Sequence, residues 1–135
     1  MKTTTHFILT CERAFLTAST NNLNIINIFS VLNTQKFPFS FPQFALVVNF
    51  DVDEPGAHTL ETRIIGPDKG MLATSRFPLQ SSGENLQVIA NFENLRFSAP
   101  GIHTLDVFLD GQPLGSRQLK VNAVVNPRAS GTNFA

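Results

Sequence analysis

The sequence contains no tryptophan and no tyrosine, although it contains thirteen phenylalanines. Sandwich domains that bind sugars or quaternary ammonium groups usually present Trp or Tyr faces, because stacking and cation–π attraction are strongest there. The absence of both residues argues against this class of ligand. Phenylalanine fills cores but carries no polar handle, so we expect a core of Phe, Leu, Val and Ile.

Charge is also scarce, and it is balanced. Ten basic and ten acidic residues make up 15% of the chain and give a formal net charge of zero. A nucleic-acid-binding protein needs a basic stripe or patch to neutralise phosphates, and this sequence has none. We therefore expect no nucleic-acid partner.

Cysteine and long apolar runs are nearly missing. Cys11 is the only cysteine, so no disulfide can form within the chain, and we expect it to be a small packing residue. No segment approaches the ~18 continuous apolar residues of a membrane span. The residues before Cys11 only faintly resemble a lipoprotein cleavage site, because their apolar run is far too short for a signal peptide. The sequence thus favours a cytoplasmic protein without membrane contact.

What the sequence does contain is a repeated Pro-Gly unit. Pro55-Gly56-Ala57-His58-Thr59-Leu60-Glu61 recurs 45 residues later as Pro100-Gly101-Ile102-His103-Thr104-Leu105-Asp106. In each copy a Pro-Gly turn leads into a segment that alternates with period two and ends at a glycine-containing turn. This repetition is typical of a β-sandwich and predicts no chemistry by itself.

Other segments show strand patterns of different kinds. From Gln43 to Val52 apolar and polar residues alternate, which predicts a strand with one wet face. The segment from Leu23 to Leu32 is apolar in both parities and predicts one central strand covered on both sides. Between them, the prolines of the segment from Phe37 to Pro42 predict an extended loop outside any sheet interior.

Taken together, these patterns predict an all-β protein. Seven or eight short strands with frequent turn signals and no helical period favour an antiparallel immunoglobulin-like β-sandwich, with a closed barrel as the alternative. We expect a single domain over residues 1–122. Residues 123–135 are rich in Asn, Pro, Ser, Gly and Ala and predict a flexible C-terminal tail.

A narrower resemblance rests on three segments: Leu23 to Phe29, Phe37 to Val47, and the closing unit from Gly101 to Val121. Through them the chain, from about Phe7 to Val121, resembles a family of small uncharacterised bacterial β-sandwich proteins of immunoglobulin-like type and unknown function. The resemblance implies a stand-alone cytoplasmic sandwich. It implies no catalytic or binding residues.

The acidic residues offer one candidate metal site. Asp51, Asp53 and Glu54 end one strand, and Asp110 ends another, which is how carboxylates converge in calcium-binding sandwich loops. Turn-flanking Asp residues also cap local backbone groups, and no EF-hand spacing is present, so no metal is expected. These four carboxylates are the metal candidates of an alternative function, a calcium- or small-ligand-binding sandwich.

The histidines give a second metal alternative. His58 and His103 share strand parity with core-like leucines, so we expect each ring to fill an aromatic slot and to hydrogen-bond a backbone carbonyl. A paired-histidine metal site would need further ligands, and His6 and Cys11 lie at no recognisable ligand spacing.

No motif for catalysis or cofactor binding is present. The chain has no Gly-x-Ser-x-Gly elbow, no phosphate-cradling glycine loop and no Cys/His signature. The sequence therefore predicts a protein that is not an enzyme and needs no cofactor. An enzyme with an unrecognised site ranks last among the alternatives.

The function favoured by the sequence is protein interaction or scaffolding. Phe37, Phe39 and Phe41 stand on a proline-stiffened connection, which would present large apolar area to an unidentified protein partner at low conformational cost. The competing interpretation is that these rings close the open edge of the sandwich. An exposed edge strand could also recruit a partner, including a second copy in a homo-oligomer.

Overall fold

The structure is a computed structural model that describes residues 1–125. These residues form nine strands and no helix, and so no helix long and apolar enough to cross a membrane occurs among them. The strands are β1 (Thr3–Leu16), β2 (Leu23–Ile28), β3 (Val31–Thr34), β4 (Phe39–Val52), β5 (Gly56–Ile65), β6 (Met71–Ser81), β7 (Asn85–Phe97), β8 (Gly101–Leu109) and β9 (Gln112–Ala123).

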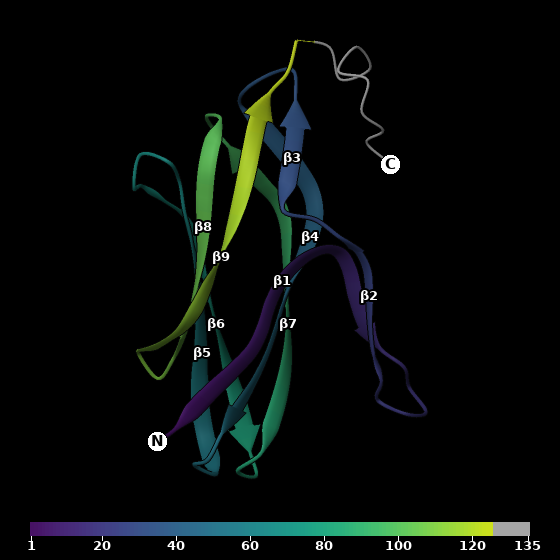
Figure 1. Ribbon diagram of the computed structural model, residues 1–135, viewed down its shortest axis with the longest axis vertical. Coiled ribbons are helices and arrows are strands. Elements are labelled where there is room, and N and C mark those ends of the chain that lie inside the picture. Colours follow the sequence, from purple (N-terminus) through teal and green to yellow (C-terminus); the bar gives the residue numbers. More distant parts are fainter. Residues whose placement is uncertain (126–135) are drawn as a thin grey trace.

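The strands form two sheets that face each other (Figure 1). A four-stranded sheet has the order β2-β1-β4-β7, and a five-stranded sheet has the order β3-β9-β8-β5-β6. Neighbouring strands run antiparallel, except that β3 runs parallel to β9. The prediction of an all-β, sandwich-like architecture built mainly from antiparallel strands is therefore confirmed.

The prediction of seven or eight strands is wrong, because the segment from Leu23 to Leu32 is not one central strand. It divides into β2, at the edge of the four-stranded sheet, and β3, at the edge of the five-stranded sheet. Both parities are apolar because the chain changes sheets in the middle of the segment. Ile28 and Val31, on either side of this crossover, are exposed rather than covered.

The predicted loop from Phe37 to Pro42 is also shorter than expected, since β4 begins at Phe39. β1 pairs with β4 only as far as the Cys11–Ala45 pair, so β4 before Phe44 has β7 as its single partner. Pro42 lies in this stretch, where β4 is locally an edge strand and a proline is tolerated. A central strand and a proline are thus compatible here.

The core lies between the two sheets. On β4 the residues that face the core are the apolar members of the predicted alternation, including Phe44, Leu46 and Phe50. The opposite face of β4 was predicted to be wet, but Ala45 and Val47 in its middle are fully buried. From the opposite sheet β5, β8 and β9 contribute Leu60, Leu105 and further buried residues. A smaller cluster on the outer face of the four-stranded sheet consists of Cys11, Ala45 and Val47, with half-buried Phe7, Ala14, Leu23, Ile25 and Ile89 against it.

The repeated Pro-Gly units begin two neighbouring strands, and they lie at opposite ends of this pair because the strands run antiparallel. Gly56 and Gly101 each begin a strand with a positive φ, 112° and 134°, a region that favours glycine. The two strands they begin, β5 and β8, pair with each other in the five-stranded sheet. The repetition seen in the sequence is therefore one local solution used for two adjacent strands.

The last strand extends beyond Val121, where the sequence pattern ends. β9 pairs with β3 up to Ala123, and the backbone N–H of Val124 donates to the Thr34 carbonyl at 2.9 Å. Most of the predicted tail, residues 126–135, lies outside the described residues.

Truncation of the core should be costly. We expect Phe50→Ala to lower the free energy of unfolding by about 3–5 kcal/mol, because the ring is fully buried and its removal leaves a cavity. Phe15→Ala, at an exposed ring of β1, is the matched control and should cost under about 1 kcal/mol. Urea unfolding at equilibrium measures both, and equal losses would contradict the core assignment.

Candidate functional site

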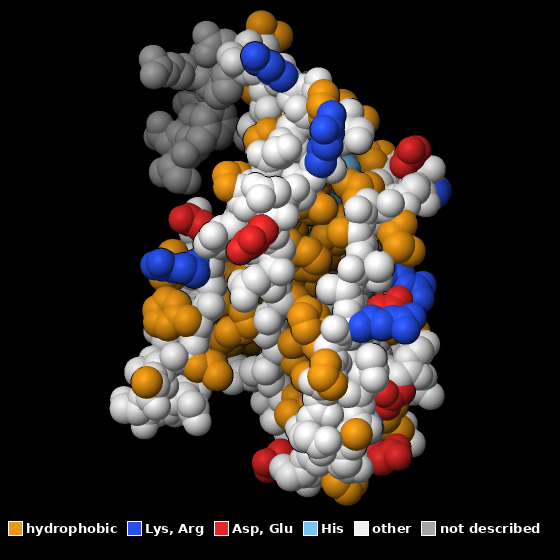
Figure 2. All heavy atoms as spheres, turned by 180° about the vertical axis from the view of Figure 1, so that it is seen from behind, with side chains coloured by type: hydrophobic (Ala, Val, Ile, Leu, Met, Phe, Trp, Pro, Cys, Tyr) orange, Lys and Arg blue, Asp and Glu red, His pale blue; other side chains and the backbone are white. Residues whose placement is uncertain are grey.

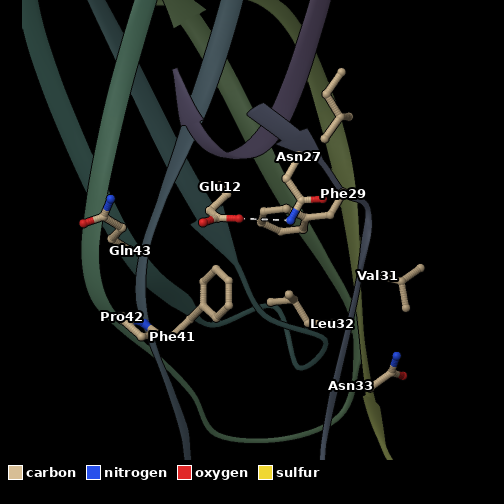
Figure 3. A pocket seen from close by; sticks show the side chains of 10 residues that line it. Glu12, Asn27, Phe29, Val31, Leu32, Asn33, Phe41, Pro42 and Gln43 are labelled. Carbon is tan, nitrogen blue, oxygen red and sulfur yellow. Dashed lines mark hydrogen bonds between the residues drawn. The ribbon is translucent and has the colours of Figure 1, made fainter. Parts of the chain in front are cut away.

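A groove opens beside the crossover from β2 to β3. Its volume is about 710 Å³, and it lies between β3 and the first residues of β4 (Figure 3). We call it the crossover groove. It is lined by Glu12, Asn27, Ile28, Phe29, Val31, Leu32, Asn33, Phe41, Pro42 and Gln43.

The floor of the groove is apolar. Phe41 and Leu32 point toward its middle, with Phe29 behind them (Figure 3). The ring centroids of Phe29 and Phe41 lie 5.7 Å apart in a T-shaped arrangement. Both rings also contact the buried Phe44, at 6.2 and 6.0 Å between centroids. The floor is thus a half-buried continuation of the core.

The rim of the groove is polar and nearly uncharged. Asn27 Nδ2 donates to Glu12 Oε2 at 3.1 Å, as the dashed line in Figure 3 shows. On the β3 side, Asn33 Oδ1 accepts a hydrogen bond from Asn122 Nδ2 at 3.1 Å. Glu12 is the one ionisable residue among those that line the groove.

Hydrogen bonds to both sheets hold the crossover in place. The Phe29 N–H donates to the Thr10 carbonyl of β1, and the Lys120 N–H of β9 donates to the Ser30 carbonyl, each at 2.9 Å. The Phe29 carbonyl accepts from the Thr10 hydroxyl and, at 3.0 Å, from Arg117 Nη2. The back wall of the groove is therefore anchored at consecutive residues.

The three predicted contact phenylalanines do not all line the groove, although the rings of Phe39 and Phe41 lie 5.9 Å apart between centroids. Phe37, Phe39 and Phe41 are all half-buried and pack against the core. The Phe39 ring stacks on Phe97, with centroids 6.2 Å apart. Only Phe41 of the three lines the groove. Six of the ten lining residues lie between Asn27 and Asn33. Most of this stretch belongs to the segment from Leu23 to Leu32, whose apolar residues in both parities were interpreted as a central strand.

The candidate calcium carboxylates do not converge on one point. Asp51 accepts hydrogen bonds from Asn85 Nδ2 and His6 Nε2, both at 2.8 Å. Both bonds lower the pKa of Asp51, and the bond from Asn85 has the larger effect. Asp53 Oδ1 accepts from the Lys2 N–H at 2.7 Å. Within residues 1–125, no three His, Cys, Asp or Glu side chains are grouped so that they could hold a metal ion.

Asp110, the fourth candidate, pairs with a buried histidine. His58 Nδ1 donates to Asp110 Oδ2 at 2.6 Å, and His58 Nε2 donates to the Glu54 carbonyl at 2.7 Å. Both acceptors are oxygens without a proton to give, so both ring nitrogens carry hydrogen and the ring is a cation. The Asp110 bond is the main reason that the pKa of His58 is raised, and it lowers the pKa of Asp110 in return.

His103 occupies the equivalent position in β8 but has a different environment. Its ring packs edge-on against Phe97, 5.0 Å between centroids, and Nδ1 donates to the Gly101 carbonyl at 3.2 Å. Burial lowers the pKa of His103, so the ring is neutral near pH 7. A second hollow of about 400 Å³ lies beside it, with Asp68, Arg96 and Ser98 among its lining residues.

Cys11 is a packing residue, as expected. The side chain is fully buried in the outer cluster, and its Sγ lies 3.7 Å from the Ala45 carbonyl oxygen. Burial raises the pKa of the thiol, which leaves little reactive thiolate.

Comparison with known proteins identifies a family but no activity. The model of a family of unknown function (DUF6941) matches residues 6–122. This confirms the resemblance to an uncharacterised family that the sequence suggested. No curated protein matches the chain.

Solved structures are similar to this chain at low sequence identity. An alkylpurine DNA glycosylase of Pseudomonas fluorescens, bound to DNA with an abasic site analog, is 15% identical with a TM-score of 0.53. The match covers 90% of this chain and 30% of the glycosylase, so this chain corresponds to under a third of that enzyme. An immunoglobulin-like protein of Pseudomonas aeruginosa is 13% identical over 90% of this chain and 98% of its own, with a TM-score of 0.44.

The His58–Asp110 pair should make stability depend on pH. The pKa of His58 is raised on folding, so its contribution is complete below the unfolded-chain pKa of about 6.5 and is lost as pH rises through the folded pKa. We expect His58→Gln to cost about 1.5–3 kcal/mol near pH 5.5, and less near pH 9. Urea unfolding of both proteins across this range measures the difference.

His103→Gln serves as the control, because the contribution of His103 to stability changes with pH in the opposite direction. The pKa of His103 is lowered on folding, so the contribution of this residue is present above about pH 6.5 and decreases as the pH falls. A cost of His58→Gln that stayed constant or grew with pH would contradict the charged assignment of His58.

Proposed function

The chain belongs to the family of unknown function DUF6941, and on that premise we propose that it is a non-enzymatic protein-interaction domain of immunoglobulin-like type. In this proposal the crossover groove receives an apolar segment of an unidentified cytoplasmic protein. The predicted contact surface thereby moves from the Phe37–Pro42 segment as a whole to the part of it that lines the groove, Phe41 and Pro42.

One observation carries this proposal. The groove joins an aromatic and aliphatic floor to a rim of amides, which resembles the apolar centre and polar rim of protein interfaces. Its volume of about 710 Å³ is large enough for several side chains of a docked segment. Exposed Ile28 and Val31 enlarge the apolar surface at its mouth.

The rigidity of the groove also supports docking. Phe29 and Ser30 are hydrogen-bonded to β1 and β9, so the wall they form does not have to become ordered when a partner binds. A preformed site avoids part of the entropic cost of association.

The charges of the groove favour binding over catalysis. General acid–base chemistry needs titratable groups placed at the reacting atoms, commonly in pairs with separated pKa values. Glu12 is the single ionisable residue of the lining, and its Oε2 already accepts a hydrogen bond from Asn27. The groove therefore provides apolar contact and amide hydrogen bonds.

A second candidate function, binding of a small polar ligand, is favoured by the hollow beside His103. Asp68, Arg96 and the neutral His103 ring line this hollow together, so it offers an acceptor, a cation and an imidazole within one space. Such a mixture suits a small polar molecule better than an apolar protein segment.

Capture from native lysate on the tagged protein tests the main proposal. We expect one protein to be retained in stoichiometric amount by the wild type and at least about tenfold less by Val31→Glu, because the new carboxylate would be desolvated at the groove mouth. Met71→Glu is the matched control, since Met71 is similarly exposed, 55% against 44%, but lies on β6 at the opposite edge of the sheet, where it lines the second hollow and not the crossover groove.

The outcome is read by mass spectrometry and then by titration of the purified partner. Equal retention by Val31→Glu would place the contact outside the groove, and no stoichiometric partner for any variant would contradict the proposal. In that case a thermal-shift screen of small polar ligands, with Arg96→Gln beside the wild type, tests the second candidate.

A further inference from the structure

Two strands lie at the edges of each sheet, and they differ in how well these edges are protected. β2 and β7 border the four-stranded sheet, and β3 and β6 border the five-stranded sheet. An unpaired edge offers its backbone N–H and C=O groups to other chains. Proteins usually protect such edges with charges, prolines, bulges or short strands.

Three of the four edges carry such protection. β6 contains Arg76 and Pro78. β7 contains Glu93 and Arg96, with the left-handed residue Asn94 between them at a φ of 52°. β3 is only four residues long, and its residues Val31, Leu32 and Asn33 already line the crossover groove. None of these edges is a good template for another strand.

β2 is the exception. Its six residues, Leu-Asn-Ile-Ile-Asn-Ile, include no charge and no proline. Two of its isoleucines, Ile26 and Ile28, are 37% and 53% exposed. Asn27 has a φ of 58° and bends the end of the strand, which leaves Leu23 to Ile26 as the regular part of the edge. Among the described residues β2 pairs with β1 alone.

The part of β1 that carries β2 lacks support from the rest of its sheet. β4 pairs with β1 only up to the Cys11–Ala45 pair, so Arg13 to Leu16 pair with β2 and with no other strand. We call this two-stranded ribbon, residues 13–26, the arm. It stands away from the body of the sandwich at the lower right of Figure 1 and the lower left of Figure 2. A two-stranded ribbon is marginally stable in water, and a third strand stabilises it.

We propose that the third strand is β2 of a second copy of this chain, paired antiparallel about a twofold axis near Ile25 and Ile26. The two four-stranded sheets then join into one sheet of eight strands. This contact goes beyond the proposed function, because its centre lies outside the residues that line the crossover groove.

The lack of charge suits a second copy as the occupant. A twofold axis places each residue of β2 opposite another residue of the same strand, and a residue on the axis faces its own copy, so a charge on the axis would face a like charge. The segment from Ala14 to Phe29 contains no Asp, Glu, Lys or Arg, and self-pairing meets no repulsion. The charged edges of β6 and β7 lack this property.

The apolar surface of the arm also favours a second copy as the partner of β2. Leu23 and Ile25 belong to the cluster on the outer face of the four-stranded sheet, around Cys11, Ala45 and Val47. A twofold axis perpendicular to the sheet keeps this face on the same side in both copies. The two outer clusters then meet across the axis and extend each other, which adds side-chain burial to the backbone hydrogen bonds.

Sedimentation velocity of the full chain between about 1 and 100 µM tests the proposal. We expect a dimer in the wild type and in Met71→Lys, whose substitution lies on the edge strand of the other sheet. Ile26→Lys places two ammonium groups near each other across the axis, and we expect it to raise the dimer dissociation constant at least about tenfold.

A wild type that stays monomeric at about 100 µM would overturn the proposal, as would an Ile26→Lys variant as dimeric as the wild type. If Ile26→Lys does not fold, as judged by its melting transition, Asn24→Lys is read instead, because Asn24 lies on the regular part of β2 and outside the groove lining. Mild oxidation of Ile25→Cys and Ile26→Cys adds a second test, since the native Cys11 thiol is buried. A dimer predicts that at least one of them forms a disulfide between copies, and no cross-link in either contradicts the pairing.

The result is separable from the groove proposal. A monomer that still captures a partner through Val31 would remove the dimer and leave the proposed function intact. A dimer that captures no partner would contradict the proposed function and leave the dimer proposal intact.

Discussion

The two residues Phe29 and Ser30 have to satisfy both sheets at once, and much of the molecule follows from this constraint. One residue hydrogen-bonds to β1 and the next to β9, so the chain changes sheets within a single peptide. β1 stops pairing with β4 at Cys11, so no strand fills the space beside the first residues of β4, and the crossover forms a wall of the groove that remains open there. For the same reason the arm extends without a third strand. Arg117 and Thr10, which both donate to the Phe29 carbonyl, fix the point on which these features depend.

The parts of the fold that the sequence predicted are those with local signals. The Pro-Gly units at Gly56 and Gly101 identified the beginnings of two strands, and the alternation after Gln43 identified the buried face of β4. The crossover was interpreted wrongly because apolar residues in both parities have two physical causes. A central strand has two buried faces. In this segment Phe29, after the edge strand β2 of one sheet, and Leu32, on the edge strand β3 of the other sheet, both pack against the core between the sheets. Periodicity alone does not separate the two.

The candidate site was predictable only in part, because it is made by tertiary contacts. Phe41 was found through its proline-rich surroundings, yet Phe39 from the same segment stacks on Phe97, more than fifty residues away in the sequence. The acidic residues show the same effect. Asp51 and Asp110 both flank turns, but one meets His6 and the other meets His58, so residues with the same local signal have different partners. The composition thus indicated an apolar contact surface, whereas its position in the molecule depends on which strands the topology brings together.

The parallel pair of β3 and β9 has a consequence for the order in which the protein can form. β9 is the last strand in the described chain, and it lies between β3 and β8. The third strand from the N-terminus must therefore wait for the last one before it has any sheet partner. During synthesis the crossover, its apolar side chains and the groove wall remain without their partner until β9 has been made. The apolar side chains of the crossover therefore stay exposed in the growing chain, at the stage when chaperones can bind them.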